Sequence, residues 1–169
     1  MDEKAVHTTL HLFKQNFKFS SAHFLIFDEK SAEKLHGHNY QVRVEIPVPS
    51  EYQATELKKK GYFVDFGVLK KWIKTRLDMW NESVLLPAQH PDMEIAKKGS
   101  TLEVHFRDRF YAFPVNEVHL LPITNTSVEN LSRILAFEFL DEFKKFGVTK
   151  IRVLVEEIRG QAASTVVQS

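Results

Sequence analysis

Two segments in the first third of the chain alternate between apolar and polar residues. In segment 13–27, one side consists of Phe13, Gln15, Phe17, Phe19, Ser21, His23, Leu25 and Phe27. In segment 36–46, one face consists of His36, His38, Tyr40, Val42, Val44 and Ile46, and Pro47 and Pro49 follow. A period of two is typical of half-buried strands, and proline disfavours continuation of a strand. The pattern therefore predicts two β-strands.

Two later segments have the apolar spacing of amphipathic helices. The first follows Asp65, a favourable N-cap residue, and its apolar positions are Leu69, Trp72, Ile73, Leu77 and Trp80. The second begins at Thr126, which forms a capping-box pattern with Glu129, and Gly147 is expected to end it. Its apolar stripe is Val128, Leu131, Ile134, Leu135, Phe139, Phe143 and Phe146. We therefore expect two helices.

The remaining segments are predicted to be shorter or less regular. The charged segment 50–60 indicates a solvated loop, and segment 87–99 is polar and irregular. Segments 101–106 and 110–113 predict a small hairpin, which we interpret as an insertion. A last strand over 149–158 is expected to place Ile151, Val153, Val155 and Glu157 on one face, before a short polar tail. This order predicts a single α+β domain over residues 1–169.

Composition and charge exclude several kinds of protein. The chain has 169 residues, 43% of them hydrophobic, which suits one ordinary domain with its own core. Twenty-three Lys and Arg against twenty-two Asp and Glu give a net charge of +1, which argues against nucleic-acid binding. The absence of cysteine excludes disulfides, thiolate metal sites and a cysteine nucleophile. No apolar run approaches the roughly 18 residues of a membrane span, and the N-terminus has no signal-peptide pattern. We therefore expect a soluble cytoplasmic protein without membrane contact.

Three histidines are the main indication of chemistry. His23 lies on the first predicted strand, and His36 and His38 lie two residues apart on the second, all on faces that are otherwise apolar. Neutral imidazole is a preferred ligand of Zn²⁺, and three protein nitrogens with one open position are typical of a catalytic zinc site. If the strands pair, the rings can converge on one ion, and Gly37 has no Cβ to obstruct the backbone between them. The alternative is three buried histidines that are each satisfied by hydrogen bonds.

Several motifs resemble one enzyme family. Phe19-Ser20-Ser21-Ala22-His23 and Leu35-His36-Gly37-His38-Asn39-Tyr40 are similar to the zinc motif of the 6-pyruvoyltetrahydropterin synthase and 6-carboxytetrahydropterin synthase family. Segments 61–66, 125–131 and 157–161 are also similar to the family, in the family's order. The resemblance implies the tunnelling fold (T-fold), a four-stranded antiparallel sheet with two helices on one face. It also implies a homo-oligomer, a hexamer built as a dimer of trimers, with sites between subunits.

The resemblance further implies ligands and a substrate. The family's zinc ligands fall on His23, His36 and His38, and its substrates are pterins, chiefly 7,8-dihydroneopterin triphosphate. The family glutamate that holds the guanidine-like edge of the pterin falls on Glu157. A carboxylate on an apolar face needs a partner, and the N–H groups of a pterin can provide one. The alternatives are a structural carboxylate paired with an arginine, a strand that has already ended, or the neighbouring Glu156 in the same role.

The sequence departs from the family at its catalytic cysteine. Relatives that make pyruvoyl or carboxy products commonly have C-x-x-x-H-G-H, and the cysteine position is Ala32 here. Beside it, Glu33 forms E-x-x-H-G-H, which resembles the variant group that removes the side chain of the substrate to give 6-hydroxymethyl-7,8-dihydropterin. This resemblance implies that Glu33 is catalytic. The alternative is a solvated glutamate in the charged loop 31–34.

A second departure concerns the Asp-His pair that assists the cysteine in the family. Counting back from Val84-Leu85-Leu86-Pro87 places Asn81 and Glu82 there, and a placement at Asp78-Met79 still lacks the histidine. Glu82 is a candidate replacement acid or base, because the pKa of a carboxyl group in a dry pocket can rise towards neutrality. It can equally be a charged residue at a helix end that faces water.

Together these features predict a zinc-dependent lyase. Zn²⁺ is expected to bind the side-chain hydroxyls of dihydroneopterin triphosphate, with Glu157 on the ring and with Glu33 and Glu82 moving protons during carbon–carbon cleavage. Three alternatives stay open. They are pyruvoyl or carboxy synthase activity with another base, a homologue that binds zinc and pterin without catalysis, and an engineered alanine in place of a native cysteine at position 32.

Overall fold

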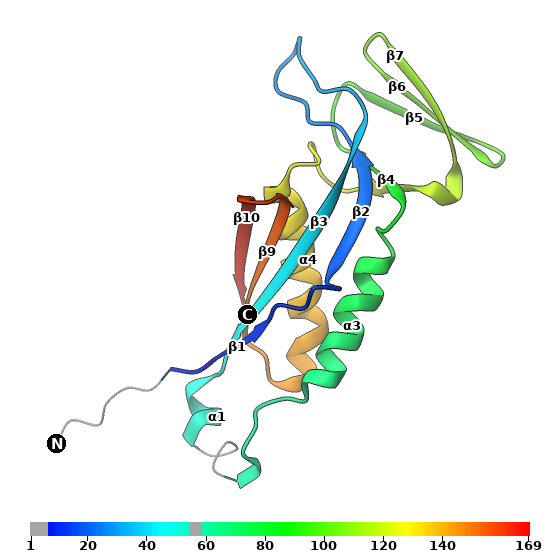
Figure 1. Cartoon of the computed structure of the whole chain (residues 1–169). Helices are drawn as coiled ribbons and strands as arrows, with labels where there is room; N and C mark the ends of the chain where they lie inside the picture. The colour runs from blue at the N-terminus through cyan, green and yellow to red at the C-terminus, as the bar shows by residue number, and fades with distance from the viewer. Residues whose placement is uncertain (1–6, 55–58) are drawn as a thin grey trace.

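The structure, a computed structural model, describes residues 7–54 and 59–169, and its centre is a sheet with two helices on one face (Figure 1). Four antiparallel strands form the middle of the sheet in the order β10-β9-β3-β2. They are β2 (Lys18–His23), β3 (His36–Pro47), β9 (Lys150–Ile158) and β10 (Gln161–Gln168). Beyond β2, the parallel strands β4 (Ser83–Pro87) and β8 (Val118–Leu121) widen the sheet, and β1 (Thr9–Leu12) pairs with β3. The predicted antiparallel sheet is therefore present with additional strands.

The main core lies between the sheet and the helices α3 (Phe66–Asp78) and α4 (Val128–Phe143). Every second residue of β3 from Tyr40 to Ile46 is fully buried, as the alternation predicts. The helices contribute Leu69, Ile73, Leu77, Leu131, Leu135, Phe139 and Phe143. Burying one large aliphatic side chain contributes on the order of 1.5–3 kcal/mol. This core holds β2 and β3, the strands that carry the three histidines, in a fixed register.

The two helices begin and end close to the predicted positions. Asp65 caps α3 by accepting a hydrogen bond from the Gly67 N–H at 2.7 Å, as predicted. Ser127, rather than Thr126, caps α4, because Thr126 is buried and its hydroxyl donates to the Phe24 carbonyl at 3.0 Å. After α4, the 3-10 helix η2 (Lys144–Phe146) ends at Gly147, whose φ of 82° is left-handed. Within the described ranges, no helix has the length and apolar character needed to cross a membrane.

The first strand is shorter than the alternation predicts. It covers only Lys18–His23, and Phe13 and Phe27 are 48% and 64% exposed. After His23 the buried positions become Phe24 and Ile26, because the chain leaves the sheet there and packs against a second apolar cluster. The prediction of a strand over 13–27 was therefore wrong at both ends.

Several segments predicted as irregular contain regular structure. Part of segment 50–60 forms α1 (Ser50–Ala54), and residues 55–58 lie outside the described residues. Segment 87–99 contains β5 (Met93–Lys98), which makes a three-stranded sheet with the predicted hairpin of β6 (Thr101–Phe106) and β7 (Arg109–Pro114). The 3-10 helix η1 (Val115–Glu117) then leads into β8. The polar tail forms β10, because strand pairing with β9 uses backbone groups and does not require an apolar pattern.

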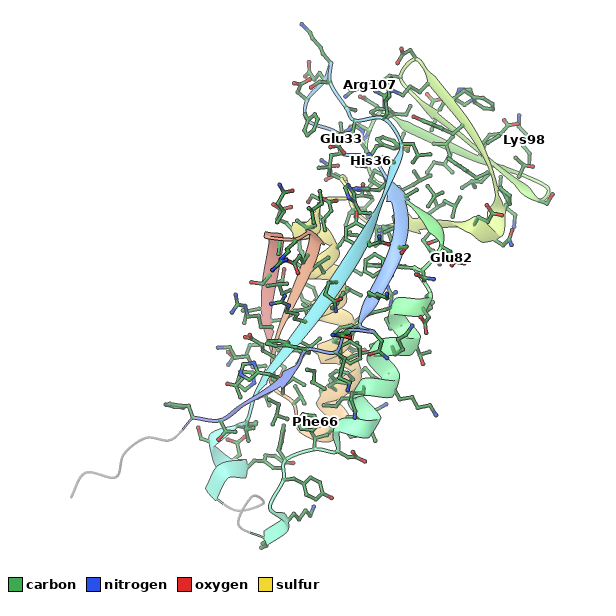
Figure 2. All side chains as sticks on the ribbon, in the orientation of Figure 1. Glu33, His36, Phe66, Glu82, Lys98 and Arg107 are labelled. Atoms are coloured by element: carbon green, nitrogen blue, oxygen red, sulfur yellow. The ribbon has the colours of Figure 1, made fainter. Side chains whose placement is uncertain are left out.

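The small sheet packs against residues 24–35, which we call the Glu33 loop. Their shared apolar cluster buries Phe24, Ile26, Leu86, Met93, Leu102, Val104 and Phe106. Ala32 and Leu35 of the loop pack against this cluster. Glu33 and His36 lie at the end of β3 nearest the small sheet (Figure 2). The small sheet is therefore a direct neighbour of the predicted site.

Candidate metal centre

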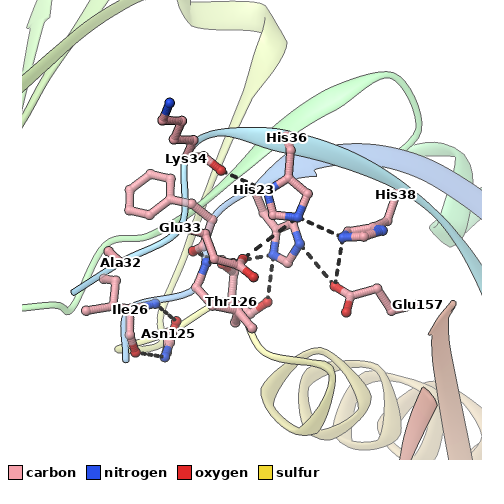
Figure 3. Close-up of polar contacts among 12 residues, drawn as sticks. His23, Ile26, Ala32, Glu33, Lys34, His36, His38, Asn125, Thr126 and Glu157 are labelled. Carbon is pink, nitrogen blue, oxygen red and sulfur yellow. Dashed lines mark hydrogen bonds and ion pairs between the residues drawn. The ribbon is translucent and has the colours of Figure 1, made fainter. Parts of the chain in front are cut away.

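The three histidines converge at the end of the β2–β3 pair (Figure 3). His23 on β2 lies directly opposite His36 on β3, and His38 lies opposite Ser21 two positions further along. All three side chains point to the same side of the sheet, because they are separated by two residues or are cross-strand neighbours. One ligand atom from each ring lies within 4.8 Å of the others. The predicted convergence on one point is therefore present.

Two backbone carbonyls fix which ring nitrogens face the centre. His23 Nδ1 lies 3.1 Å from the Thr126 carbonyl oxygen, and His36 Nδ1 lies 2.8 Å from the Lys34 carbonyl oxygen. A carbonyl only accepts, so each Nδ1 carries the proton and donates it, and each Nε2 presents a lone pair. Metal-binding histidines commonly donate their second nitrogen in this way. Both rings are therefore held in the tautomer that a metal ion needs.

The surroundings of His23 Nε2 fit a bound cation. This atom is buried and makes no hydrogen bond, although Glu157 Oε1 lies only 3.0 Å away. The imidazole proton is on Nδ1, so a nitrogen lone pair faces a carboxylate oxygen, and a cation between them would satisfy both. Burial lowers the pKa of His23, while the nearby Glu157 carboxylate acts in the opposite direction. The neutral imidazole that binds metals is therefore favoured.

Glu157 lies beside the histidines and not on the outer surface. Its Oε1 is 3.7 Å from His38 Nε2 and accepts a hydrogen bond of 3.0 Å from the Tyr40 hydroxyl. Burial, together with the Glu157 carboxylate, raises the pKa of Tyr40, which therefore remains a protonated donor. The neighbouring Glu156 is instead bound by Arg43 at 3.4 Å and by the Gly160 N–H at 2.8 Å. Of the two glutamates, Glu157 is the one at the centre.

Glu33 also turns its carboxylate towards the histidines. Its Oε2 lies 3.8 Å from His36 Nε2 and accepts a hydrogen bond of 3.0 Å from the Leu25 N–H. The adjacent Ala32 forms an isolated bridge with Ile26 and packs against the apolar cluster of the small sheet. A solvated spacer would not have these contacts. Position 33, and not position 32, is therefore directed to the centre.

Glu82 lies in a different part of the structure from Glu33 and Glu157. It is exposed with a left-handed φ of 57°, and its N–H donates to the Ser20 carbonyl at 2.7 Å. It lines a groove of about 410 Å³ with residues that include Ser20, Gly37, His38 and Asn39. Within the described parts of the chain, no hydrogen bond or ion pair joins Glu82 to the three histidines. The alternative Asp78 forms an ion pair with Lys74. A single chain thus brings Glu33 and Glu157 to the histidines, but not Glu82.

Sequence reasoning missed the groups that orient the histidines. The sequence around Thr126 matches a helix cap. Nothing in that pattern indicates that the Thr126 carbonyl accepts a hydrogen bond from His23, which is 103 residues away in the chain. The Lys34 carbonyl is a backbone group, so its side chain carries no signal for the contact with His36. Tyr40 lies on the predicted face of β3, but only the structure shows its bond to Glu157.

An α+β fold with three convergent imidazoles and two adjacent carboxylates defines a protein with a candidate metal centre of the kind found in enzymes. The sequence matches the family described as 6-pyruvoyl tetrahydropterin synthase over residues 12–166. It is 32% identical over 149 residues to a protein of Methanocaldococcus jannaschii provisionally named 6-carboxy-5,6,7,8-tetrahydropterin synthase, covering 86% of this chain and 87% of that protein. The chain therefore belongs to the 6-pyruvoyl tetrahydropterin synthase family, a family of lyases.

Solved structures confirm the predicted T-fold. The crystal structure of 6-pyruvoyl tetrahydropterin synthase from Plasmodium vivax has a TM-score of 0.85 at 23% identity, covering 98% of this chain and 100% of that chain. The enzyme from Plasmodium falciparum has a TM-score of 0.84 at 22% identity, covering 96% of this chain and 99% of that chain. Two further Plasmodium vivax structures carry alanine or cysteine in place of a glutamate that their names describe as a catalytic residue.

Proposed function

We propose that this protein is a zinc-dependent lyase that converts 7,8-dihydroneopterin triphosphate to 6-hydroxymethyl-7,8-dihydropterin. The observation that carries the proposal is the position of Glu33, whose carboxylate lies 3.8 Å from His36 Nε2. Ala32, where the family has its cysteine, packs against the small sheet instead. The Plasmodium vivax enzyme, which has a glutamate described as catalytic, supports a carboxylate in this role.

The donor set supports zinc as the metal. Three neutral imidazole nitrogens suit Zn²⁺ and leave an open position for a substrate oxygen. When bound, the ion supplies positive charge that lowers the pKa of a hydroxyl group and polarises a developing carbonyl. The chain's own carboxylates would then move and hold the protons.

The reaction is a retro-aldol cleavage that needs no oxidant. Glu33 accepts the proton of the hydroxyl on the second side-chain carbon, and that carbon becomes a carbonyl as the bond to the first carbon breaks. The electron pair passes into the C=N bond of the dihydropterin ring, and a proton is then returned to the first carbon. The products are 6-hydroxymethyl-7,8-dihydropterin and the triphosphate ester of glycolaldehyde. The role of Glu33 is general base catalysis.

Glu157 is proposed as a substrate contact at the same centre. Its Oε1 lies 3.0 Å from His23 Nε2, next to the place where the substrate side chain would bind. The guanidine-like edge of a pterin is at the opposite end of the ring from its side chain. The geometry therefore favours contact with the side-chain end over the predicted contact with the ring edge. With a Glu157→Gln variant, affinity for unsubstituted pterin is expected to be unchanged, whereas a contact with the ring edge would require that affinity to fall.

The identity of the product tests the proposed reaction. Zinc-loaded protein is incubated with 7,8-dihydroneopterin triphosphate, and the pterin product is identified by mass spectrometry. We expect the 6-hydroxymethyl product, its loss in Glu33→Ala, and unchanged turnover in Glu29→Ala, an exposed glutamate of the same loop. A 6-hydroxymethyl product that persists in Glu33→Ala would remove Glu33 from the mechanism.

A second candidate is 6-carboxy- or 6-pyruvoyl-tetrahydropterin synthesis with a base other than cysteine. The 32% identity to the Methanocaldococcus jannaschii protein favours the carboxy product among these. A carboxy or pyruvoyl product in the same assay would select this candidate. Binding of the substrate without any turnover would instead identify a homologue that has kept the pocket and lost the chemistry.

A further inference from the structure

We propose that Arg109, at the start of β7 in the inserted sheet, is a positioning residue that holds Glu33 at the metal centre. The inference rests on the proposed catalytic role of Glu33. Arg109 Nη2 donates to the Ala32 carbonyl at 3.0 Å, and its Nη1 donates to the Glu33 carbonyl. A guanidinium group has fixed, diverging donors, so one side chain can hold two consecutive carbonyls in one orientation.

The Glu33 side chain depends on this backbone orientation. The Glu33 N–H donates to the Leu25 carbonyl at 2.8 Å, and the Leu25 N–H donates to Glu33 Oε2 at 3.0 Å. These reciprocal bonds tie the Glu33 side chain to the opposite limb of its loop. That limb is itself fixed by Asn125, whose amide bonds both the N–H and the carbonyl of Ile26 at 3.1 and 2.8 Å. Arg109 fixes the side of the loop that carries Glu33 in the same way, through the Ala32 and Glu33 carbonyls.

The contacts of Arg109 with the Ala32 and Glu33 carbonyls also influence His36, a proposed metal ligand. Lys34 directly follows Glu33, and its carbonyl accepts a hydrogen bond of 2.8 Å from the Nδ1–H of His36. A rotation of the peptide planes at Ala32 and Glu33 would therefore displace both the Glu33 carboxylate and the carbonyl that orients His36. The inserted sheet thus acts on two groups of the centre through one arginine.

Arg107 provides a matched comparison from the same β6–β7 turn. It donates to the Asp28 carbonyl at 2.7 Å and pairs with Asp92 at 2.7 Å, so it holds the tip of the loop and not the Glu33 end. Arg133 is an exposed arginine on α4 that serves as a control for loss of positive charge.

Hydrogen exchange on the full chain with added Zn²⁺ tests the inference without using activity. In Arg109→Met, the Leu25 and Glu33 amides are expected to exchange roughly 10- to 100-fold faster, because hydrogen bonds from a charged donor are lost. Arg107→Met should affect the amides near Asp28 and leave those two unchanged, and Arg133→Met should affect neither. Arg109→Lys keeps the positive charge but has a single donor group, so the exchange rates of the two amides are expected to lie between those of the native protein and Arg109→Met. This variant replaces Arg109→Met in the test if Arg109→Met does not fold.

Turnover of 7,8-dihydroneopterin triphosphate then shows whether Arg109 positions Glu33 for the reaction or only stabilises the loop. We expect Arg109→Met to lower kcat about tenfold or more with little change in KM, since substrate contacts are retained while the base is misplaced. Unchanged exchange at Leu25 and Glu33 overturns the inference, and so does faster exchange with an unchanged kcat. If the native protein makes no 6-hydroxymethyl product, the proposed function fails, and the exchange result alone decides whether Arg109 orders the loop.

Discussion

Two backbone carbonyl oxygens determine the tautomers of His23 and His36. The Thr126 and Lys34 carbonyls accept hydrogen bonds from the Nδ1–H groups of His23 and His36, which leaves both Nε2 lone pairs directed inwards. Without a cation, the buried His23 Nε2 has no hydrogen-bond partner. These contacts explain why three histidines on paired strands can form a metal centre and need not be core residues.

Replacement of one ligand should abolish tight metal binding. Loss of groups that only orient the ligands typically costs 10- to 100-fold in affinity, so His38→Ala is expected to lower zinc affinity by more than about 100-fold. Metal analysis after dialysis measures this. His105→Ala, which removes an exposed histidine on β6, should retain stoichiometric zinc. Stoichiometric zinc in His38→Ala would show that the ligand assignment is wrong.

The lowered pKa of His23 predicts how the stability of metal-free protein depends on pH. Below the ordinary value of 6.5, the unfolded chain binds a proton at this position that the folded chain, with its lowered pKa, does not bind. Above pH 6.5 neither state binds this proton, so His23 does not reduce the stability of the folded chain. As the pH falls from 6.5 towards the folded pKa, proton uptake by the unfolded chain progressively lowers the free energy of unfolding. Urea unfolding of chelator-treated protein measures the free energy of unfolding across this range.

The matched variant for that experiment is His23→Gln, which cannot take up a proton. It should have a smaller loss of stability on acidification than the native chain. His105→Gln, at an exposed position, should behave like the native chain. Equal losses in native protein and His23→Gln would contradict the assignment of the effect to His23.

The Glu33 loop and the small sheet form one structural unit in which Glu33 faces the histidines and Ala32 is partly buried against the sheet. The side chain of Ala32 packs against the cluster that contains Phe24 and Phe106, while Glu33 is tied to Leu25. Adjacent residues of a locally extended segment point in opposite directions, so Glu33 faces the candidate metal centre while Ala32 faces the small sheet. This placement supports the proposal that Glu33, and not a residue at position 32, takes part in the reaction.

Restoring a cysteine at the family position should not restore the family chemistry. In Ala32→Cys the thiol would be in apolar surroundings, and burial raises the pKa of a thiol and lowers its reactivity. We expect slow labelling by a thiol reagent in the zinc-loaded protein and no pyruvoyl or carboxy product. Ala112→Cys, at an exposed position of β7, should be labelled rapidly. Fast labelling together with a new product in Ala32→Cys would instead support a native cysteine at this position.

Among the described residues, the two long helices α3 and α4 lie on the same face of the main sheet (Figure 1). Phe13 is 48% exposed and packs under Arg43, and the groove that Glu82 lines also includes His38. We propose that copies of the chain assemble as a hexamer of two trimers, which the family resemblance implies. Because the resemblance implies sites between subunits, we propose that Glu82 of one copy contributes to the centre of a neighbouring copy.

Light scattering coupled to size-exclusion chromatography tests this assembly. The mass of the chain is 19.7 kDa, and we expect a particle of six chains. Association of subunits makes stability depend on protein concentration, so the unfolding temperature should fall on dilution. A monomer that keeps full turnover would contradict a site that needs two subunits.

The amino-acid sequence by itself determined the features that depend on local pattern. Alternation predicted the buried face of β3, helical spacing behind Asp65 predicted α3, and the two-residue spacing of His36 and His38 placed both rings on one face. The two-residue period along β9 likewise placed Glu157 on the face of Val155. Backbone geometry within one element fixes these relations, so they can be predicted without knowledge of the rest of the fold.

Only the tertiary structure decided which groups surround the histidines. The bond from Arg109 to the Glu33 carbonyl spans 76 residues, and the bond from His23 to Thr126 spans 103. The Glu33 loop has no regular period, so its sequence could not predict which way residues 32 and 33 point. β4 and β8 were also missed, because short strands buried on a wide sheet show little alternation. These features depend on long-range packing and on the path of irregular backbone, which a local pattern does not encode.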